Sequence, residues 1–245
     1  MDEKVALVTG GATGLGRSIV EKFVTENHKV VFTYFKSEEK AQDIINEYGD
    51  RVYGIKTDAT NYDEVLNSIE QAINKYGRID ILVNNAAASK DAPIGNHTSE
   101  TWDFTIKNIL YSCFNYANAI TSHFVKNRYG KIINIGSING LRGREGSVAY
   151  CTAKAGMVGL TKTVAKELGR YNINVNLIAP GYIDTEAQKS TSLIIKKVVL
   201  DECAIKELTK PEEIADLVLF LSSEKAKAIT GQVYKIDRGQ YVWMK

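Results

Sequence analysis

Short apolar runs alternate with longer amphipathic segments from one end of the chain to the other. The short runs are rich in β-branched residues, which predicts strands at 5–9, 30–32, 52–56, 79–83, 131–135, 174–178 and 233–236. Between them, apolar residues recur at helical spacing, which predicts helices at about 14–26, 38–48, 63–75, 99–126, 147–170 and 211–221. Apolar strands that alternate strictly with helices form a parallel sheet covered on both faces. The pattern therefore predicts an α/β fold with a doubly wound, seven-stranded parallel sheet.

The predicted sheet lies within one continuous domain. No proline-rich linker, low-complexity tract or repeat divides the chain, and only three prolines occur in its 245 residues. We therefore expect residues 1–245 to form a single domain. The least periodic stretch, at about 182–210, is longer than an ordinary connection between sheet elements. Its length favours a substrate lid or binding segment.

Charge and composition argue against several classes of protein. Lys and Arg number 31 against 29 Asp and Glu, so the formal net charge of +2 offers no basic surface for nucleic acid. No apolar run approaches the roughly 18 residues of a membrane span, and the charged first residues do not resemble a signal peptide. The three cysteines and three histidines lack disulfide or metal-ligand spacing. We expect a cytoplasmic protein with reduced thiols, no metal, and neither nucleic acid nor membrane as partner.

A glycine-rich turn follows the first predicted strand and opens the first predicted helix. Gly10, Gly14 and Gly16 remove side chains where the backbone must turn sharply and approach a phosphate closely. The free N–H groups and the positive end of the helix would then face the pyrophosphate of a dinucleotide. An isolated glycine cluster also forms plain tight turns. Its place after the first strand of an alternating chain favours the nucleotide site.

The end of the second predicted strand bears on the choice of cofactor. A site that prefers NAD usually has an acidic residue there, which accepts hydrogen bonds from the ribose 2′-hydroxyl. Here the first acid is Glu38, and Tyr34, Lys36 and Ser37 precede it. A carboxylate at that place would repel the 2′-phosphate of NADP, so its absence favours NADP(H) over NAD(H). The alternative interpretation is a solvated turn that contains a lysine.

Tyr150 and Lys154 are four residues apart in a predicted helix, which puts both side chains on one helical face. An ammonium near a phenol favours the phenolate and lowers a pKa that is otherwise near ~10. The pair by itself is common on ordinary helix surfaces. Ser137, however, ends the fifth predicted strand, and ligands of open α/β sheets bind at such strand ends. Asn85 ends the fourth predicted strand in the same way. Asn108 lies in the helix that connects the fourth and fifth predicted strands.

Taken together, these residues form a series of motifs that resembles the short-chain dehydrogenase/reductase family over essentially the whole chain. Within that family, the segments 81–85, 130–137, 153–166, 174–185, 211–221 and 229–232 are most similar to 3-oxoacyl-[acyl-carrier-protein] reductases. The motifs stand in family order and spacing: Thr9-Gly10-x-x-x-Gly14-x-Gly16, Asn84-Asn85-Ala86, Asn108, Ser137, Tyr150-x-x-x-Lys154 and Pro180-Gly181-x-x-x-Thr185.

The resemblance implies a Rossmann-type domain and an NADPH-dependent reduction of a 3-oxoacyl thioester to the 3-hydroxyacyl thioester. It implies that Tyr150 donates a proton to the carbonyl oxygen and that Ser137 hydrogen-bonds that oxygen. Lys154 would hold the cofactor ribose and lower the tyrosine pKa, and Asn108 would order a water that relays protons to the lysine. The family usually assembles as homotetramers, through the long helices that precede the fifth and sixth strands.

The resemblance also implies a set of cofactor-binding residues that follows the strand ends. The set comprises Gly10, Thr13, Gly14, Leu15, Gly16, Tyr34, Lys36, Ser37, Asp58, Ala59, Asn85, Ala86, Tyr150, Lys154, Pro180, Gly181, Ile183 and Thr185.

The chain departs from the subgroup pattern at a few places. Ala87 replaces a glycine, and Thr13 stands where NADP-preferring members often carry a basic residue. Of two arginines that the subgroup presents to its carrier protein, only Arg128 is present, because Tyr171 stands at the other place. The usual glycine pair near the carboxyl end reads Asp237-Arg238-Gly239.

Substrate identity stays open at this stage. Arg142, Arg144, Lys189, Lys196 and Lys197 could attract a carrier-bound or other anionic substrate, or could be solvated surface charges. One alternative function is a ketoreductase of secondary metabolism, or a sugar or alcohol dehydrogenase. A more distant alternative is a non-catalytic NADP-binding protein.

Overall fold

Seven parallel strands make the central sheet of the computed structural model, which describes residues 3–186 and 192–242. Their spatial order is β3-β2-β1-β4-β5-β6-β7, and every neighbouring pair in the described chain is parallel. This order reverses direction between β1 and β4, which is where a doubly wound sheet opens a crevice. The predicted fold class is therefore confirmed. The strands are β1 (Val5–Val8), β2 (Lys29–Tyr34), β3 (Val52–Lys56), β4 (Ile81–Asn84), β5 (Gly130–Ile135), β6 (Ile173–Pro180) and β7 (Val233–Ile236).

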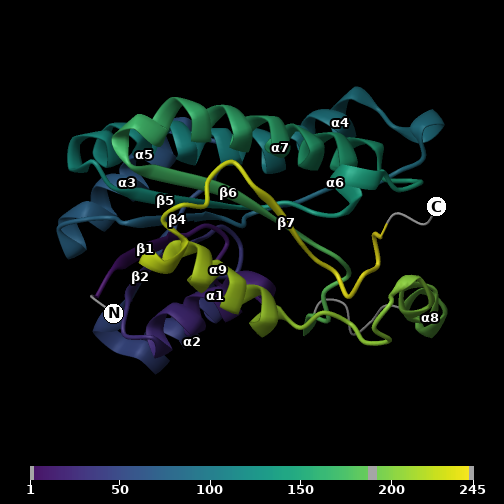
Figure 1. Cartoon of the computed structure of the whole chain (residues 1–245), viewed down its shortest axis with the longest axis horizontal. Coiled ribbons are helices and arrows are strands. Elements are labelled where there is room, and N and C mark those ends of the chain that lie inside the picture. The colour runs from purple at the N-terminus through teal and green to yellow at the C-terminus, as the bar shows by residue number, and fades with distance from the viewer. Residues whose placement is uncertain (1–2, 187–191, 243–245) are drawn as a thin grey trace.

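Helices cover both faces of the sheet (Figure 1). On one face lie α1 (Gly14–Thr25), α2 (Glu38–Tyr48) and α9 (Pro211–Ser222). On the other face lie α3 (Tyr62–Tyr76), α5 (Ser112–Asn127) and α7 (Val148–Leu168).

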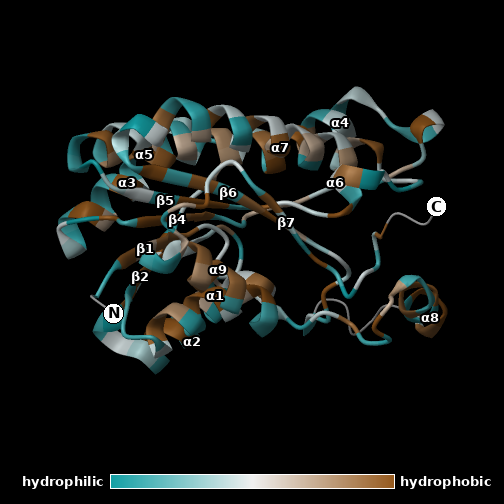
Figure 2. Cartoon of the chain, viewed as in Figure 1, coloured by the Kyte–Doolittle hydropathy of each residue, from teal (hydrophilic) through white to brown (hydrophobic). Residues whose placement is uncertain are grey.

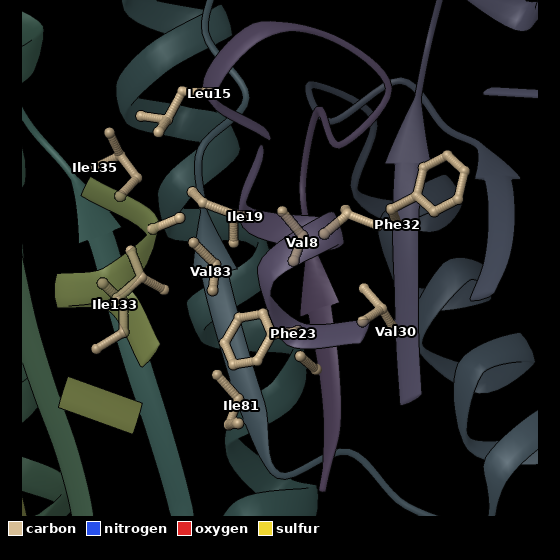
Figure 3. Packing of buried hydrophobic residues seen from close by; sticks show 14 of the residues in the cluster. Val8, Leu15, Ile19, Phe23, Val30, Phe32, Ile81, Val83, Ile133 and Ile135 are labelled. Carbon is tan, nitrogen blue, oxygen red and sulfur yellow. The ribbon is translucent and has the colours of Figure 1, made fainter. Parts of the chain in front are cut away.

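The two layers exist because alternate residues of each strand point to opposite faces. Val8 packs among the residues of α1, whereas its neighbour Leu7 belongs to the cluster beneath α3 and α5. On α1, Ile19 and Phe23 are four residues apart and lie over the sheet near Val83 (Figure 3). All five side chains are at least 99% buried, so both faces of the sheet are dry.

The long helix expected at 99–126 is interrupted in the structure. It consists of α4 (Ser99–Ile106), a π-helical segment at Lys107–Tyr111, and α5. A π-helical turn widens the helix by one residue and is frequent at functional sites. Periodicity alone did not predict it, because the segment is only 5 residues long, too short to show a period of its own.

Two further helices lie at the end of the molecule that holds the carboxyl ends of the strands. The short α6 (Asn139–Arg142) follows β5, and α8 (Leu193–Glu202) lies within the segment expected to be a lid. Figure 1 shows α8 apart from both helical layers, and Figure 2 shows much of it in the colour of hydrophobic residues. Only Val199 of α8 is buried, so no core stripe marked this helix in the sequence. No helix in the described ranges has the length and hydrophobicity of a membrane span.

Candidate active site

The carboxyl ends of β1, β4, β5 and β6 lie along one edge of the sheet, because parallel neighbours all end on the same side. Residues that are far apart in sequence meet along this edge. Ser137 comes two residues after β5, and Asn85 comes directly after β4. The first turns of α7 then bring Tyr150 and Lys154 beside them.

The glycine turn is tied to the end of β4 by several hydrogen bonds. The Thr9 hydroxyl accepts from the backbone N–H groups of Asn85 and Ala86, both at 2.9 Å. The Asn85 side-chain Nδ2 donates back to the carbonyl oxygens of Thr9 at 2.9 Å and Gly10 at 3.2 Å. The amide of Asn85 therefore holds the shape of the turn.

Glycine is required in this turn for two different reasons. Gly10 and Gly14 have φ of +64° and +52°, in the left-handed region that disfavours other residues. At Gly16 a Cβ would lie 2.1 Å from the carbonyl oxygen of Gly10 and 2.6 Å from Nδ2 of Asn85. No side chain of the described residues caps the start of α1 at Thr13, which leaves its first N–H groups for an anion.

The segment that follows β6 closes over this turn. A Cβ on Gly14 would lie 3.8 Å from the Thr185 methyl group, so Thr185 borders the glycine turn. The Pro180 carbonyl accepts from the N–H of Ile138 at 3.0 Å, which joins the segment to the loop after β5. Ile183 forms a parallel bridge with Thr209. The expected contacts after β6 thus lie between the glycine turn and the β5 loop.

The residues expected at the adenosine end lie after β2 and β3. Lys36 is exposed, and its amine lies 6.0 Å from the centroid of the Phe35 ring. Glu38 forms an ion pair with Lys56 at 3.0 Å, so its charge is balanced. The Asp58 carboxylate accepts from both the N–H and the hydroxyl of Thr60, at 2.8 and 2.7 Å. Asp58 thereby forms the turn after β3.

Four more residues that were expected to bind the cofactor lie in the core or next to helix α2 or strand β3. Leu15, in the first turn of α1, is buried in the core between this helix and the sheet. Tyr34 packs against the same core, and Ser37 precedes α2. The carbonyl of Ala59 accepts from Nδ2 of Asn115 at 3.1 Å, so α5 fixes the backbone after β3.

Lys154 is the most buried charged group of the site. Its Nζ donates to the backbone carbonyl of Ile135, the last residue of β5, at 2.6 Å, and it lies 5.9 Å from the centroid of the Tyr150 ring. Only 4% of the residue is exposed. Ser137 is also buried, and its Oγ accepts from the N–H of Asn139 at 3.1 Å.

The pKa values at this site follow from burial. Burial raises the pKa of Tyr150, and a hydrogen bond with the Ser137 side chain offsets part of that rise. The charge of Asp91 raises the same pKa further. Burial lowers the pKa of Lys154 from 10.5 to about 8. Burial is the largest influence on the tyrosine pKa, and the effect of Lys154, whose amine lies 5.9 Å from the ring centroid, stays a prediction.

Asn108 lies in the π-helical segment. Its Nδ2 donates to the carbonyl of Phe104 at 2.8 Å, and its own carbonyl accepts from the Ser112 hydroxyl at 2.9 Å. Within the part of the chain that the structure describes, no direct hydrogen bond joins Asn108 to Lys154. The widened turn therefore fixes the orientation of the amide through its own helix.

A buried amide network beneath the site was not anticipated from the sequence. Asn134 accepts from Nδ2 of Asn84 at 2.9 Å and from Sγ of Cys113 at 3.4 Å, and it donates to the Thr161 hydroxyl at 2.8 Å. This one side chain thus connects β4, β5, α5 and α7. An amide within the otherwise apolar run at 132–135 was the available signal.

A cavity of about 680 Å³ opens beside the two hydroxyls. Ser137 and Tyr150 form part of its wall, and apolar side chains of α8, among them Ile195 and Val198, form another part. Arg142 and Arg144 both line it, as expected from the sequence, but Arg142 is paired with Glu202 at 2.9 Å.

Other charges that were expected to attract substrate lie elsewhere. Lys196 and Lys197 of α8 are not among the residues that line the cavity, and Lys189 lies outside the described residues. Arg128 ends α5 two residues before β5 begins, so it lies at the opposite end of that strand from the cavity. In the described part of the chain, no group of three or more His, Cys, Asp or Glu side chains could hold a metal ion.

The chain matches known proteins over nearly its full length. A family model described as enoyl-(acyl carrier protein) reductase matches residues 10–240. A 3-oxoacyl-[acyl-carrier-protein] reductase from Staphylococcus epidermidis is 36% identical over 98% of this chain and 99% of that protein. The chain belongs to the short-chain dehydrogenase/reductase family. Proteins of the same name from Thermotoga maritima and Chlamydia muridarum are 35% and 38% identical, over 98% and 96% of this chain and of their own lengths.

Membership of the short-chain dehydrogenase/reductase family identifies the protein as an oxidoreductase that uses a nicotinamide cofactor. The glycine turn fits such a cofactor, because it joins β1 to α1 and no side chain of the described residues caps the N–H groups at the start of α1.

Burial of the Lys154 amine should make the stability of the folded protein depend on pH. A folded-state pKa of about 8, below the ordinary 10.5, means that the unfolded chain binds the proton more tightly. At pH 7 the protonated amine should therefore cost on the order of 3 kcal/mol of folding free energy, and this cost should vanish as pH rises from about 8 to 10.5. We expect Lys154→Met to be more stable than the parent at pH 7.

Denaturant unfolding of the two proteins between pH 6.5 and 10.5 measures this difference. The advantage of the variant should shrink as pH rises through the window. A difference that stays constant with pH would show that the amine is not perturbed by burial.

Proposed function

We propose that the protein reduces a 3-oxoacyl thioester to the 3-hydroxyacyl thioester with NADPH. The observation that carries the proposal is the cavity in which the hydroxyls of Ser137 and Tyr150 face the same space as the apolar side chains of α8. Two hydroxyl groups suit the polar carbonyl of such a substrate, and apolar side chains suit its acyl chain. The relatives named as 3-oxoacyl-[acyl-carrier-protein] reductases support this substrate class.

The cofactor would be held along the strand ends. The N–H groups at the start of α1 would face its pyrophosphate, at the tight turn that Gly10, Gly14 and Gly16 allow. Lys154 would hydrogen-bond the ribose, and its position at the end of β5, 5.9 Å from the centroid of the Tyr150 ring, supports this role. The bound cofactor supplies the hydride.

The protein would supply the proton and stabilise the developing charge. Negative charge grows on the ketone oxygen as hydride arrives, and the hydroxyls of Ser137 and Tyr150 can both donate hydrogen bonds to it. Because burial raises the pKa of Tyr150, the phenol stays protonated at neutral pH and can then transfer its proton to that oxygen. Asn108, oriented by its helix, would order the water that returns a proton through Lys154.

NADPH is proposed as the preferred cofactor. No acid lies between Tyr34 and Ser37, and the first acid, Glu38, is already paired with Lys56. Lys36 is exposed beside this site and has a charge that suits a 2′-phosphate.

A second candidate function keeps the chemistry and changes the substrate to a polar ketone, such as a sugar or another small ketone. The observation that favours it is the set of polar side chains in the cavity, which includes Asp91, Arg142, Glu202 and Gln240. Turnover of acetoacetyl thioesters compared with a panel of ketoses and cyclic ketones separates the two functions. Consumption of NADPH with any ketone excludes a non-catalytic NADP-binding protein.

We also propose that the protein is a cytoplasmic homotetramer. Tyr111 and Phe114 are 56% and 48% exposed at the junction of the π-helical segment and α5. Large exposed aromatic side chains on a long helix suit burial against a second copy of the chain.

If Tyr150 is the proton donor, its loss should lower turnover but leave NADPH affinity nearly unchanged. Tyr150→Phe removes the hydroxyl but keeps the ring, so turnover of an acetoacetyl thioester should fall by a factor of about 10³ or more. NADPH affinity, measured by fluorescence titration, should stay within a few-fold of the parent. Tyr171→Phe, at a tyrosine outside the cavity, is the matched control. Near-normal turnover in Tyr150→Phe would refute the assignment.

The cofactor preference predicts a role for the exposed lysine after β2. Lys36→Ala should weaken NADPH binding by about tenfold, since one charge-assisted contact to phosphate is lost, and should leave NADH binding unchanged. Lys162→Ala, on α7, is the control for loss of a positive charge elsewhere. Calorimetric titration of both nucleotides measures the effect. Equal weakening for NADPH and NADH would contradict contact with the 2′-phosphate.

A further inference from the structure

A polar cluster lies on the wall of the cavity, where the apolar face of α8 ends. Along α8, Ile195, Val198 and Val199 line the cavity, and Glu202 follows on the same face about 4.5 Å further along the helix axis than Val199. The face therefore changes from aliphatic to charged within one helical turn.

Three side chains from separate parts of the chain form this cluster. Glu202 Oε2 accepts from Nη2 of Arg142 and from Nε2 of Gln240, both at 2.9 Å. Arg142 Nη1 also donates to the backbone carbonyl of Gln240 at 3.5 Å. The cluster thus connects α6, α8 and the segment after β7. Each charge has a partner. Burial acts to raise the pKa of Glu202, but its hydrogen bonds with Gln240 and Arg142 and the nearby positive charges outweigh burial and hold that pKa below its ordinary value, so the carboxylate is ionised at neutral pH.

The same cluster is joined to the Ser137 hydroxyl through Asn139. Arg142 Nε donates to Oδ1 of Asn139 at 3.3 Å, and the backbone N–H of Asn139 donates to Oγ of Ser137 at 3.1 Å. A substrate whose ketone contacts Ser137 and Tyr150 therefore has the aliphatic face of α8 on one side and the Arg142–Glu202 pair at the end of that face.

We propose that the Arg142–Glu202–Gln240 cluster determines substrate specificity by limiting the length of the acyl chain, so that the enzyme prefers short 3-oxoacyl groups. This inference rests on the proposed function. A short acyl group contacts only the aliphatic side chains of α8. A longer one must lie against the ion pair and remove water from it, which costs free energy that an aliphatic chain cannot return.

The test compares two chain lengths in one pair of variants. The substrates are N-acetylcysteamine thioesters of acetoacetate and 3-oxodecanoate, and kcat/KM is measured for each with NADPH. For the parent we expect kcat/KM to be at least tenfold higher with the acetoacetyl substrate. In Arg142→Met/Glu202→Leu, where the ion pair is replaced by aliphatic side chains of similar size, we expect this ratio to fall at least tenfold, mainly through a lower KM for the long substrate.

The ratio of kcat/KM for the two substrates distinguishes an effect on chain-length specificity from an effect on the position of Ser137. Loss of the bond between Arg142 and Asn139 could slow both substrates through Ser137, but equally, and so would leave the ratio unchanged. Lys22→Met/Asp216→Leu is the matched control, because it removes a 2.8 Å ion pair between α1 and α9 that does not line the cavity. Its ratio should equal that of the parent.

Each outcome decides one of the two proposals. If the parent reduces neither thioester, the proposed function fails and this inference fails with it. If the parent reduces both but favours the longer chain, or if the double variant keeps the parent ratio, only the limit on chain length is overturned. Gln240→Met provides a second variant with a smaller expected shift, about threefold, should the double variant not fold by circular dichroism.

Discussion

One hydrogen bond, from the buried amine of Lys154 to the carbonyl of Ile135, fixes the geometry on which the site depends. It joins the second turn of α7 to the last residue of β5. Tyr150 lies one helical turn earlier and Ser137 two residues beyond the strand, so this bond sets where the phenol and the hydroxyl meet. The amine is held there at a cost, because burial disfavours its charge. A protonatable amine that is kept beside a protonated phenol can serve proton transfer.

The glycine turn supplies the second fixed point. Thr9 and Asn85 bind each other's backbone across β1 and β4, the strands between which the sheet changes direction. The strand order that opens the crevice between β1 and β4 therefore also brings together the residues that hold the glycine turn in place. The pyrophosphate site and the hydroxyl pair are parts of one edge, separated by β4 and β5, so a dinucleotide that lies along the edge reaches both.

Most of the fold could be predicted because its central strands, β1, β4, β5 and β6, are buried on both faces and so are mostly continuous apolar runs in the sequence. The π-helical turn at Asn108 could not, because its 5 residues are too few to show a period of their own. Helix α8 could not, because its apolar residues face the cavity and the solvent instead of the core.

Motif spacing predicted that Tyr150, Lys154 and Ser137 lie at one site. It did not predict that the pKa of Tyr150 is raised, since the burial that raises it depends on the loops around the phenol. Nor could it show that Arg142 is neutralised by Glu202, sixty residues away.

The most direct measurement is a crystal structure of the protein grown with NADPH. We expect the pyrophosphate to lie over the turn from Gly10 to Gly16, the ribose of the nicotinamide within hydrogen-bond distance of Lys154 Nζ, and the nicotinamide ring facing the cavity beside Ser137 and Tyr150. A nucleotide bound elsewhere, or a nicotinamide ring turned away from these two hydroxyls, would contradict the proposed geometry for reduction.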